Sequence, residues 1–189
     1  MKSTIFALAL TTLLSFNSAM AVDHAPGKIT GTGIELFERN HSFAGEISGT
    51  PVFGVFDEAN FVSEVSIRHN GATLLLKIAD ANGKFVGSLT EDRIDEATGK
   101  STQIVTSLEF AGVKKTGEAE GLVNLIIDGQ AVVVNIVGES FANNHFHAPT
   151  YSTTLNGQAV TFSFTGEACF GYSTNLSMMI LGAMAHITK

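Results

Sequence analysis

The side chains best suited to chemistry in this sequence are two histidines, His145 and His147, separated by one residue. On a β-strand, residues i and i+2 point to the same face about 6–7 Å apart, so two imidazoles in this spacing can share a Zn²⁺ or Cu²⁺ ion. A complete site needs a third ligand, which His41, His69 or an acidic side chain could supply and which the sequence does not identify. Pro149 favours a strand end or loop here, where both imidazoles would instead face water.

The beginning of the chain has the features of a signal peptide. Lys2 provides a positive charge, Ile5 to Leu14 form an apolar stretch, and Ala19-Met20-Ala21 has small residues at the positions typical of a cleavage site. We predict a signal peptide over residues 1–21, cleaved after Ala21, and a single β domain over residues 22–189. The product is expected in the periplasm or outside the cell.

Cleavage after Ala21 would create a second candidate metal site at the new N-terminus. His24 becomes the third residue of the mature chain. The free amine, two backbone amides and the imidazole at position three can form a square-planar site for Cu²⁺ or Ni²⁺. This site depends entirely on the position of cleavage.

The single cysteine, Cys169, is unusual for an exported protein, because oxidising compartments normally hold cysteines in pairs. Its neighbours include Ala168 and Phe170, so a buried free thiol and an intermolecular disulfide both remain open. The sequence has no nucleophile motif in a suitable context, no phosphate loop and no dinucleotide fingerprint. We therefore predict no catalytic residue and favour a protein that is not an enzyme.

Composition excludes several classes of protein. The chain has 189 residues, of which 44% are hydrophobic and 15% charged, so it is not disordered. With 11 basic and 18 acidic side chains, its net charge of −7 argues against nucleic acid or an anionic membrane surface as partner. No segment is apolar over the roughly 20 residues of a transmembrane helix.

The elements that must position the histidines are strands joined by tight turns. After residue 60, the pairs that favour such turns are Asn70-Gly71, Asn82-Gly83, Thr98-Gly99, Asp128-Gly129 and Asn156-Gly157. Where two of these pairs lie far apart in the sequence, we predict further turns between them, at Gly112 to Gly117 and at Asn143 to Pro149. This spacing predicts an all-β fold, an antiparallel barrel or sandwich of about nine to eleven strands.

One hairpin can be assigned in detail. A turn at Asp128-Gly129 pairs Leu125 with Val132 and Val123 with Val134. The predicted core face of this hairpin consists of Val123, Leu125, Ile127, Val132, Val134 and Ile136.

The end of the chain changes its hydrophobic period. Ser173-Thr174-Asn175 could cap a helix that starts near Leu176, with apolar residues on almost all sides. Such a helix would be buried on most sides or plug the end of a barrel. A final strand is the alternative, because Gly182 weakens a helix.

An outer-membrane barrel would also show alternating strands and glycine-rich turns. These barrels carry aromatic girdles at both interfaces, whereas this chain has no Trp and only two Tyr. The composition therefore disfavours that class.

The sequence predicts non-enzymatic binding as the function. A barrel interior lined by some of the 14 Phe and 5 Met could hold a small apolar ligand, or the loops could bind a protein or glycan partner. One alternative is a periplasmic protein that binds Cu or Zn through His145, His147 and His24; another is a secreted structural or effector protein. The sequence indicates neither the ligand nor the oligomeric state.

Overall fold

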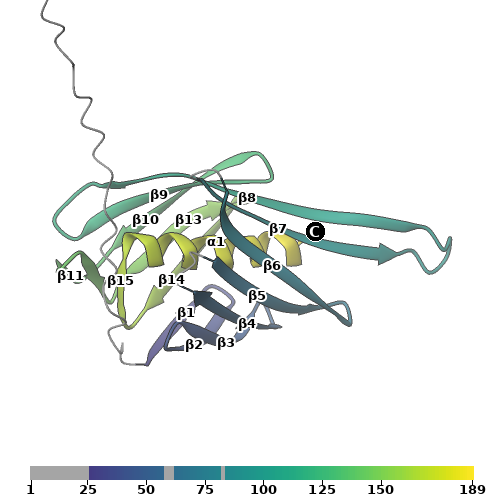
Figure 1. Ribbon diagram of the computed structural model, residues 1–189, viewed down its shortest axis with the longest axis horizontal. Coiled ribbons are helices and arrows are strands. Elements are labelled where there is room, and N and C mark those ends of the chain that lie inside the picture. Colours follow the sequence, from purple (N-terminus) through teal and green to yellow (C-terminus); the bar gives the residue numbers. More distant parts are fainter. Residues whose placement is uncertain (1–25, 58–61, 82–83) are drawn as a thin grey trace, which may run out of the picture.

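Twelve antiparallel strands close into a barrel, and a C-terminal helix runs through its interior (Figure 1). The computed structural model describes residues 26–57, 62–81 and 84–189. The order of strands around the barrel is β1-β14-β13-β10-β9-β8-β7-β6-β5-β4-β3-β2. Three short strands form a separate sheet in the order β11-β12-β15.

The barrel strands are β1 (Gly27–Gly31), β2 (Ile34–Arg39), β3 (Ser42–Ile47), β4 (Thr50–Asp57), β5 (Val62–His69), β6 (Ala72–Ala81), β7 (Lys84–Ile94), β8 (Ser101–Lys115), β9 (Glu120–Ile127), β10 (Gln130–Val137), β13 (Thr150–Leu155) and β14 (Gln158–Phe164). The small sheet consists of β11 (Ser140–Ala142), β12 (His145–His147) and β15 (Glu167–Cys169). The helix is α1 (Phe170–Ile187). The β7–β8 hairpin projects beyond the rest of the barrel as a long arm (Figure 1).

Alternation of apolar and polar residues along the strands produces the inner and outer faces of the barrel. The register predicted for the Asp128-Gly129 hairpin is confirmed, with Leu125 opposite Val132 and Val123 opposite Val134. All six residues of its predicted core face are buried. Asp128 and Gly129 both have positive φ, as two-residue hairpin turns of this type require. The predicted Asn82-Gly83 turn lies outside the described residues.

The predicted number of strands was too low, although the all-β class, the barrel alternative and the C-terminal helix are confirmed. Four of the twelve strands, β1 to β4, precede residue 60. Their turns contain Asn40-His41 and Ser48-Gly49, all with positive φ, rather than the Asn-Gly or Asp-Gly pairs used to count hairpins. The turn predicted between Gly112 and Gly117 begins later than expected, because β8 continues to Lys115 and a β-bulge lies between Phe110 and Gly112.

Helix α1 fills the interior of the barrel. Its residues from Tyr172 to His186 are all buried, although Ser173, Thr174, Asn175 and Ser177 are polar. The sequence placed the cap of this helix too late. Cys169 is the N-cap, and its sulfur accepts a hydrogen bond from the backbone N–H of Tyr172 at 3.3 Å.

Two of the three polar residues predicted to cap α1, Ser173 and Asn175, instead connect it to the barrel wall. The Ser63 hydroxyl of β5 donates to Asn175 Oδ1 at 2.9 Å. The hydroxyls of Tyr151 and Ser173 lie 3.0 Å apart and share a hydrogen bond. These buried contacts fix the position of the helix along the barrel axis, because an unpaired buried polar group is costly.

The small sheet lies at the N-terminal end of α1. Phe146 of β12 packs edge-on against Phe170, with ring centroids 5.0 Å apart, and against Phe141 of β11 at 4.8 Å. Because β15 leads directly into α1, this sheet anchors the start of the helix.

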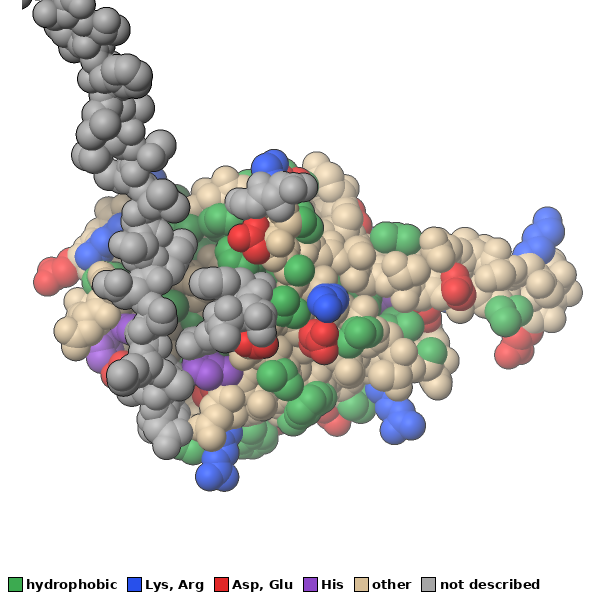
Figure 2. All heavy atoms as spheres, in the orientation of Figure 1, with side chains coloured by type: hydrophobic (Ala, Val, Ile, Leu, Met, Phe, Trp, Pro, Cys, Tyr) green, Lys and Arg blue, Asp and Glu red, His purple; other side chains and the backbone are tan. Residues whose placement is uncertain are grey.

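Hydrophobic residues also occur on the outer face. Strand register places Phe37, Ala44, Phe53, Ser66 and Leu75 in one row across β2 to β6. Phe37, Phe53 and Leu75 are each more than half exposed. On the face seen in Figure 2, Lys and Arg side chains are scattered rather than gathered into a basic patch. Within the described ranges, none of the helices is both long enough and apolar enough to cross a membrane.

Candidate metal centre

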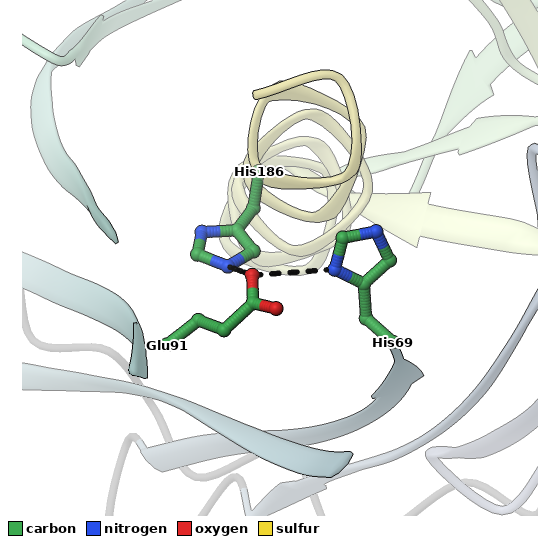
Figure 3. A group of neighbouring side chains, drawn as sticks. All are labelled: His69, Glu91 and His186. Atoms are coloured by element: carbon green, nitrogen blue, oxygen red, sulfur yellow. Dashed lines mark hydrogen bonds and ion pairs between the residues drawn. The ribbon is translucent and has the colours of Figure 1, made fainter. Parts of the chain in front are cut away.

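Three ionisable side chains meet inside the barrel near the C-terminal end of α1. His69 is the last residue of β5, Glu91 lies in β7, and His186 lies in the last turn of α1. Figure 3 shows the three side chains pointing toward one another from these separate elements. Along their strands, His69 is in phase with the buried Val65 and Ile67, and Glu91 with Leu89, so period-2 alternation directs both inward.

The potential ligand atoms of this group converge. His186 Nε2 lies 3.1 Å from Glu91 Oε2, and His69 Nδ1 lies 3.3 Å from the same oxygen. The three atoms all lie within 4.8 Å of one another. The two imidazole rings are 6.1 Å apart and nearly perpendicular.

Glu91 is held as a carboxylate although only 3% of its side chain is exposed. Arg93 donates to Glu91 Oε2 from Nη2 at 2.8 Å and from Nε at 3.0 Å, and Asn70 Nδ2 donates to Oε1 at 3.1 Å. The hydrogen bonds from Arg93 are the main cause that lowers the pKa of Glu91 to about 2, against the effect of burial. The site therefore contains a permanent negative charge at neutral pH.

His186 is fully buried, and this burial is the main cause that lowers the pKa of its imidazole below the usual value. The ring is therefore neutral at pH 7, as a metal ligand must be. Its Nδ1 lies 3.0 Å from the hydroxyl of Thr106, which is also fully buried. Because the Glu91 carboxylate can only accept, Nε2–H of the neutral ring donates to it and Nδ1 accepts from the Thr106 hydroxyl. Metal binding at Nε2 would use the other tautomer, in which Nδ1–H donates to the Thr106 hydroxyl, and such outer contacts typically orient metal-binding histidines.

Two imidazoles and one carboxylate are a suitable donor set for a divalent transition metal. Zn²⁺ accepts nitrogen and oxygen ligands at about 2.0–2.2 Å, often with three protein ligands and one further position. Nucleophilic catalysis is less well supported, because Thr106 and His186 are both fully buried. The least buried of the three ligands is His69, with 13% of its side chain exposed.

The structure does not bring the predicted pair, His145 and His147, to this cluster. Both lie on β12, where each imidazole has a neighbour of its own. His147 Nδ1 lies 3.1 Å from Glu167 Oε1, and His145 Nδ1 lies 2.8 Å from the carbonyl oxygen of Asn143. Metal binding by this pair stays a prediction.

The other residues considered from the sequence are distributed differently. His24 and the signal peptide lie outside the described residues. Of the two histidines proposed as third ligands, His69 belongs to the cluster inside the barrel, and His41 lines a small cavity together with His145. Cys169 is a free cysteine and is only partly buried.

Sequence reasoning missed Glu91 and His186, although one signal was present. A charged residue in phase with the inward face of a strand, as Glu91 is with Leu89, requires a partner inside the core. The sequence pattern could not identify this partner, because His186 lies 95 residues further along the chain.

Comparison with family models, with curated proteins and with solved structures gave no match for this chain. The functional argument therefore depends on the geometry of the site.

Proposed function

We propose that the interior of the barrel holds a site for a divalent transition-metal ion, with Zn²⁺ as the best-matched ion, formed by His69 Nδ1, Glu91 Oε2 and His186 Nε2. The observation that carries the proposal is the convergence of these three atoms within 4.8 Å of one another. A carboxylate that stays ionised and a neutral buried imidazole supply the protonation states that the ion needs.

Arg93 has a defined role in this proposal. Without a metal ion, its guanidinium compensates the buried charge of Glu91 through the two hydrogen bonds to Oε2. With a metal ion bound, Arg93 would act as an outer contact that orients the carboxylate. Because 28% of the Arg93 side chain is exposed, it can shift toward solvent as the ion enters.

The test is a titration of the mature protein, stripped of metal by a chelator, with Zn²⁺ in a His24→Ala/Cys169→Ser background. These two changes remove the predicted N-terminal chelate and the cysteine at the other end of α1, so that zinc binding reports on the cluster inside the barrel. We expect binding of one ion at this site, and a rise in Tm of roughly 5–10 °C at a free Zn²⁺ concentration about a hundredfold above Kd. His69→Asn and Glu91→Gln are expected to abolish this binding, whereas the matched variant His147→Asn is expected to retain it.

His69 is the most informative position, because it is partly exposed and its replacement leaves the buried His186 in place. Zinc affinity that is unchanged in His69→Asn and in Glu91→Gln would overturn the proposal. Circular dichroism of each variant separates a loss of binding from a loss of folding.

An apolar ligand inside the barrel has less support than it had from the sequence. The described part of the interior is occupied by α1, whose buried face includes Leu176, Met179 and Ile180. A protein or glycan partner stays a prediction. The exposed row of Phe37, Phe53 and Leu75 is the surface that would support such binding.

We also propose that the protein is exported, with residues 1–21 removed after Ala21. The support is the charge, apolar stretch and small residues at the start of the sequence. N-terminal sequencing of protein from its own host should begin at Val22, and any other start would remove the predicted site at His24.

A further inference from the structure

A second group of ligand-type side chains lies at the opposite end of α1. Five of the residues that line a small cavity there are Glu38, His41, His145, Glu167 and Cys169. Its volume is about 20 Å³, enough for one water molecule or one ion. Cys169 and His186 are 17 positions apart along the helix, which corresponds to roughly 25 Å, so this cavity is distinct from the first site.

Glu38 is the first observation that points to a ligand. Its side chain is 3% exposed, and it lies in phase with the buried Ile34 and Leu36 on the inner face of β2. Oε1 accepts a hydrogen bond from the backbone N–H of His41 at 2.9 Å, but Oε2 has no hydrogen-bond partner among the described residues. A buried carboxylate oxygen without a donor is costly, and a bound cation would remove that cost.

Cys169 provides a sulfur atom at the same cavity. It is directly opposite His145 in the β12–β15 pair, which places the two Cβ atoms about 4.5–5.5 Å apart on one face. The N–H of Tyr172 at the start of α1 donates to Sγ at 3.3 Å. A helix N-terminus favours negative charge, which is the form in which a cysteine binds metal.

His145 is oriented as a ligand. Its Nδ1 lies 2.8 Å from the carbonyl oxygen of Asn143, and this oxygen can only accept, so Nδ1 carries the proton. In the neutral ring, Nε2 is then the atom with a lone pair, and a backbone carbonyl on the other nitrogen is a typical outer contact of a metal-binding histidine.

We propose that this cavity binds a single borderline or soft divalent cation, Zn²⁺, through Glu38 Oε2, His145 Nε2 and Cys169 Sγ. Sulfur, nitrogen and carboxylate oxygen together are a typical zinc donor set. Among the described residues, none that lines the cavity is Lys or Arg, which favours a cation over an anion. Within the described part of the chain, the ligand atoms that lie within 4.8 Å of one another are those of His69, Glu91 and His186. Binding at the second site would therefore require side chains of Glu38, His145 and Cys169 to rotate toward the ion.

The experiment uses Co²⁺ as a spectroscopic probe on the full mature protein, under oxygen-free conditions. A sulfur-to-cobalt charge-transfer band in the near ultraviolet is expected, and it reports only on this site because the first site contains no sulfur. Cys169→Ser should abolish the band while its hydroxyl still caps α1. Glu38→Gln and His145→Asn should each raise the Kd for Co²⁺, measured by titration of this band, by about tenfold or more.

Two controls separate this proposal from the first. His69→Asn, which removes the first site, should leave the charge-transfer band unchanged. In the unaltered protein, Zn²⁺ should slow the alkylation of Cys169 by iodoacetamide at least tenfold, a measurement that needs no variant. Co²⁺ binding without the band, a band insensitive to Glu38→Gln and His145→Asn, or unchanged alkylation would each overturn the second site.

Discussion

At the scale of single residues, Glu91 is a buried carboxylate that contacts several nitrogen atoms at once. Its Oε2 atom lies within 3.3 Å of nitrogen atoms from His69, Arg93 and His186. This one oxygen therefore links side chains of β5, β7 and α1. A buried ion pair adds little net stability compared with apolar residues, but removing one partner is costly.

We predict that Glu91→Gln lowers the free energy of unfolding of the metal-free protein by about 3 kcal/mol at pH 7, because a neutral amide cannot compensate Arg93. Chemical denaturation in the presence of EDTA measures this change. The matched control is Glu109→Gln, which breaks the exposed Lys84–Glu109 pair and should cost less than about 1 kcal/mol. Equal losses in the two variants would contradict the burial argument.

We also predict that the stabilising effect of Glu91 depends on pH. The pKa of Glu91 is lowered to about 2 in the folded protein from a usual value of 4.5, mainly by the hydrogen bonds from Arg93. Its contribution to stability is therefore present above pH 4.5 and is lost as pH falls toward 2. We expect the difference between the unaltered protein and Glu91→Gln to shrink over this interval.

Spacing along the chain can identify only candidate residues that lie close together in sequence. It singled out His145 and His147 because two positions suffice to define that pattern, and metal binding by this pair stays a prediction. The cluster of His69, Glu91 and His186 joins residues 22 and 95 positions apart, so only the three-dimensional arrangement brings them together. The sequence contains a weaker sign of Glu38 and Glu91. Each is a charged residue at a position where the alternation of its strand predicts an apolar, inward-facing side chain.

At the scale of elements, α1 is the part that the sequence described least completely. Its apolar pattern predicted a helix buried on most sides, and this is confirmed. The position of its cap was wrong, because Ser173, Thr174 and Asn175 resemble a cap by residue type. Inside the barrel, Ser173 and Asn175 instead bond to Tyr151 and Ser63, contacts that depend on strand positions unknown at the sequence level.

Two polar residues of α1 should respond in opposite directions to replacement by alanine. The Ser177 hydroxyl is buried and has no hydrogen-bond partner among the described residues, so Ser177→Ala should stabilise the protein by about 0.5–1 kcal/mol. Asn175→Ala leaves the buried Ser63 hydroxyl without its acceptor and should destabilise the protein by about 1–3 kcal/mol. Thermal unfolding of both variants checks the pair, and destabilisation of similar size in both would contradict it.

At the scale of the whole molecule, the barrel and its helix depend on each other. The sequence predicted strands, turns and the hairpin register, because these follow from local periodicity. It did not predict that the helix would occupy the full interior, because the diameter of a barrel follows from the number of strands and their stagger. Twelve strands leave room that side chains alone do not fill, and the 15 buried residues from Tyr172 to His186 fill it.

We predict that a mature chain truncated after Cys169 loses its cooperative unfolding transition and binds the dye ANS, because the apolar inner faces of the strands lose their cover. Calorimetry and dye fluorescence measure the two effects. Truncation after Ile187, which removes only Thr188 and Lys189, is the control and should retain a cooperative transition. A cooperative transition at an unchanged Tm in the chain ending at Cys169 would show that the barrel is stable without its helix.

The closure between β1 and β14 has a consequence for how the protein is made. The contact between Lys28 N–H and the hydroxyl of Thr165 spans 137 residues, and α1 follows only after that strand. The barrel therefore cannot close before β14 has been synthesised. Until then, the edge of β1 that pairs with β14 stays unpaired. If residues 1–21 act as the signal peptide proposed above, this delay would be useful, because a chain that cannot close its barrel early stays unfolded and can pass through a translocation pore.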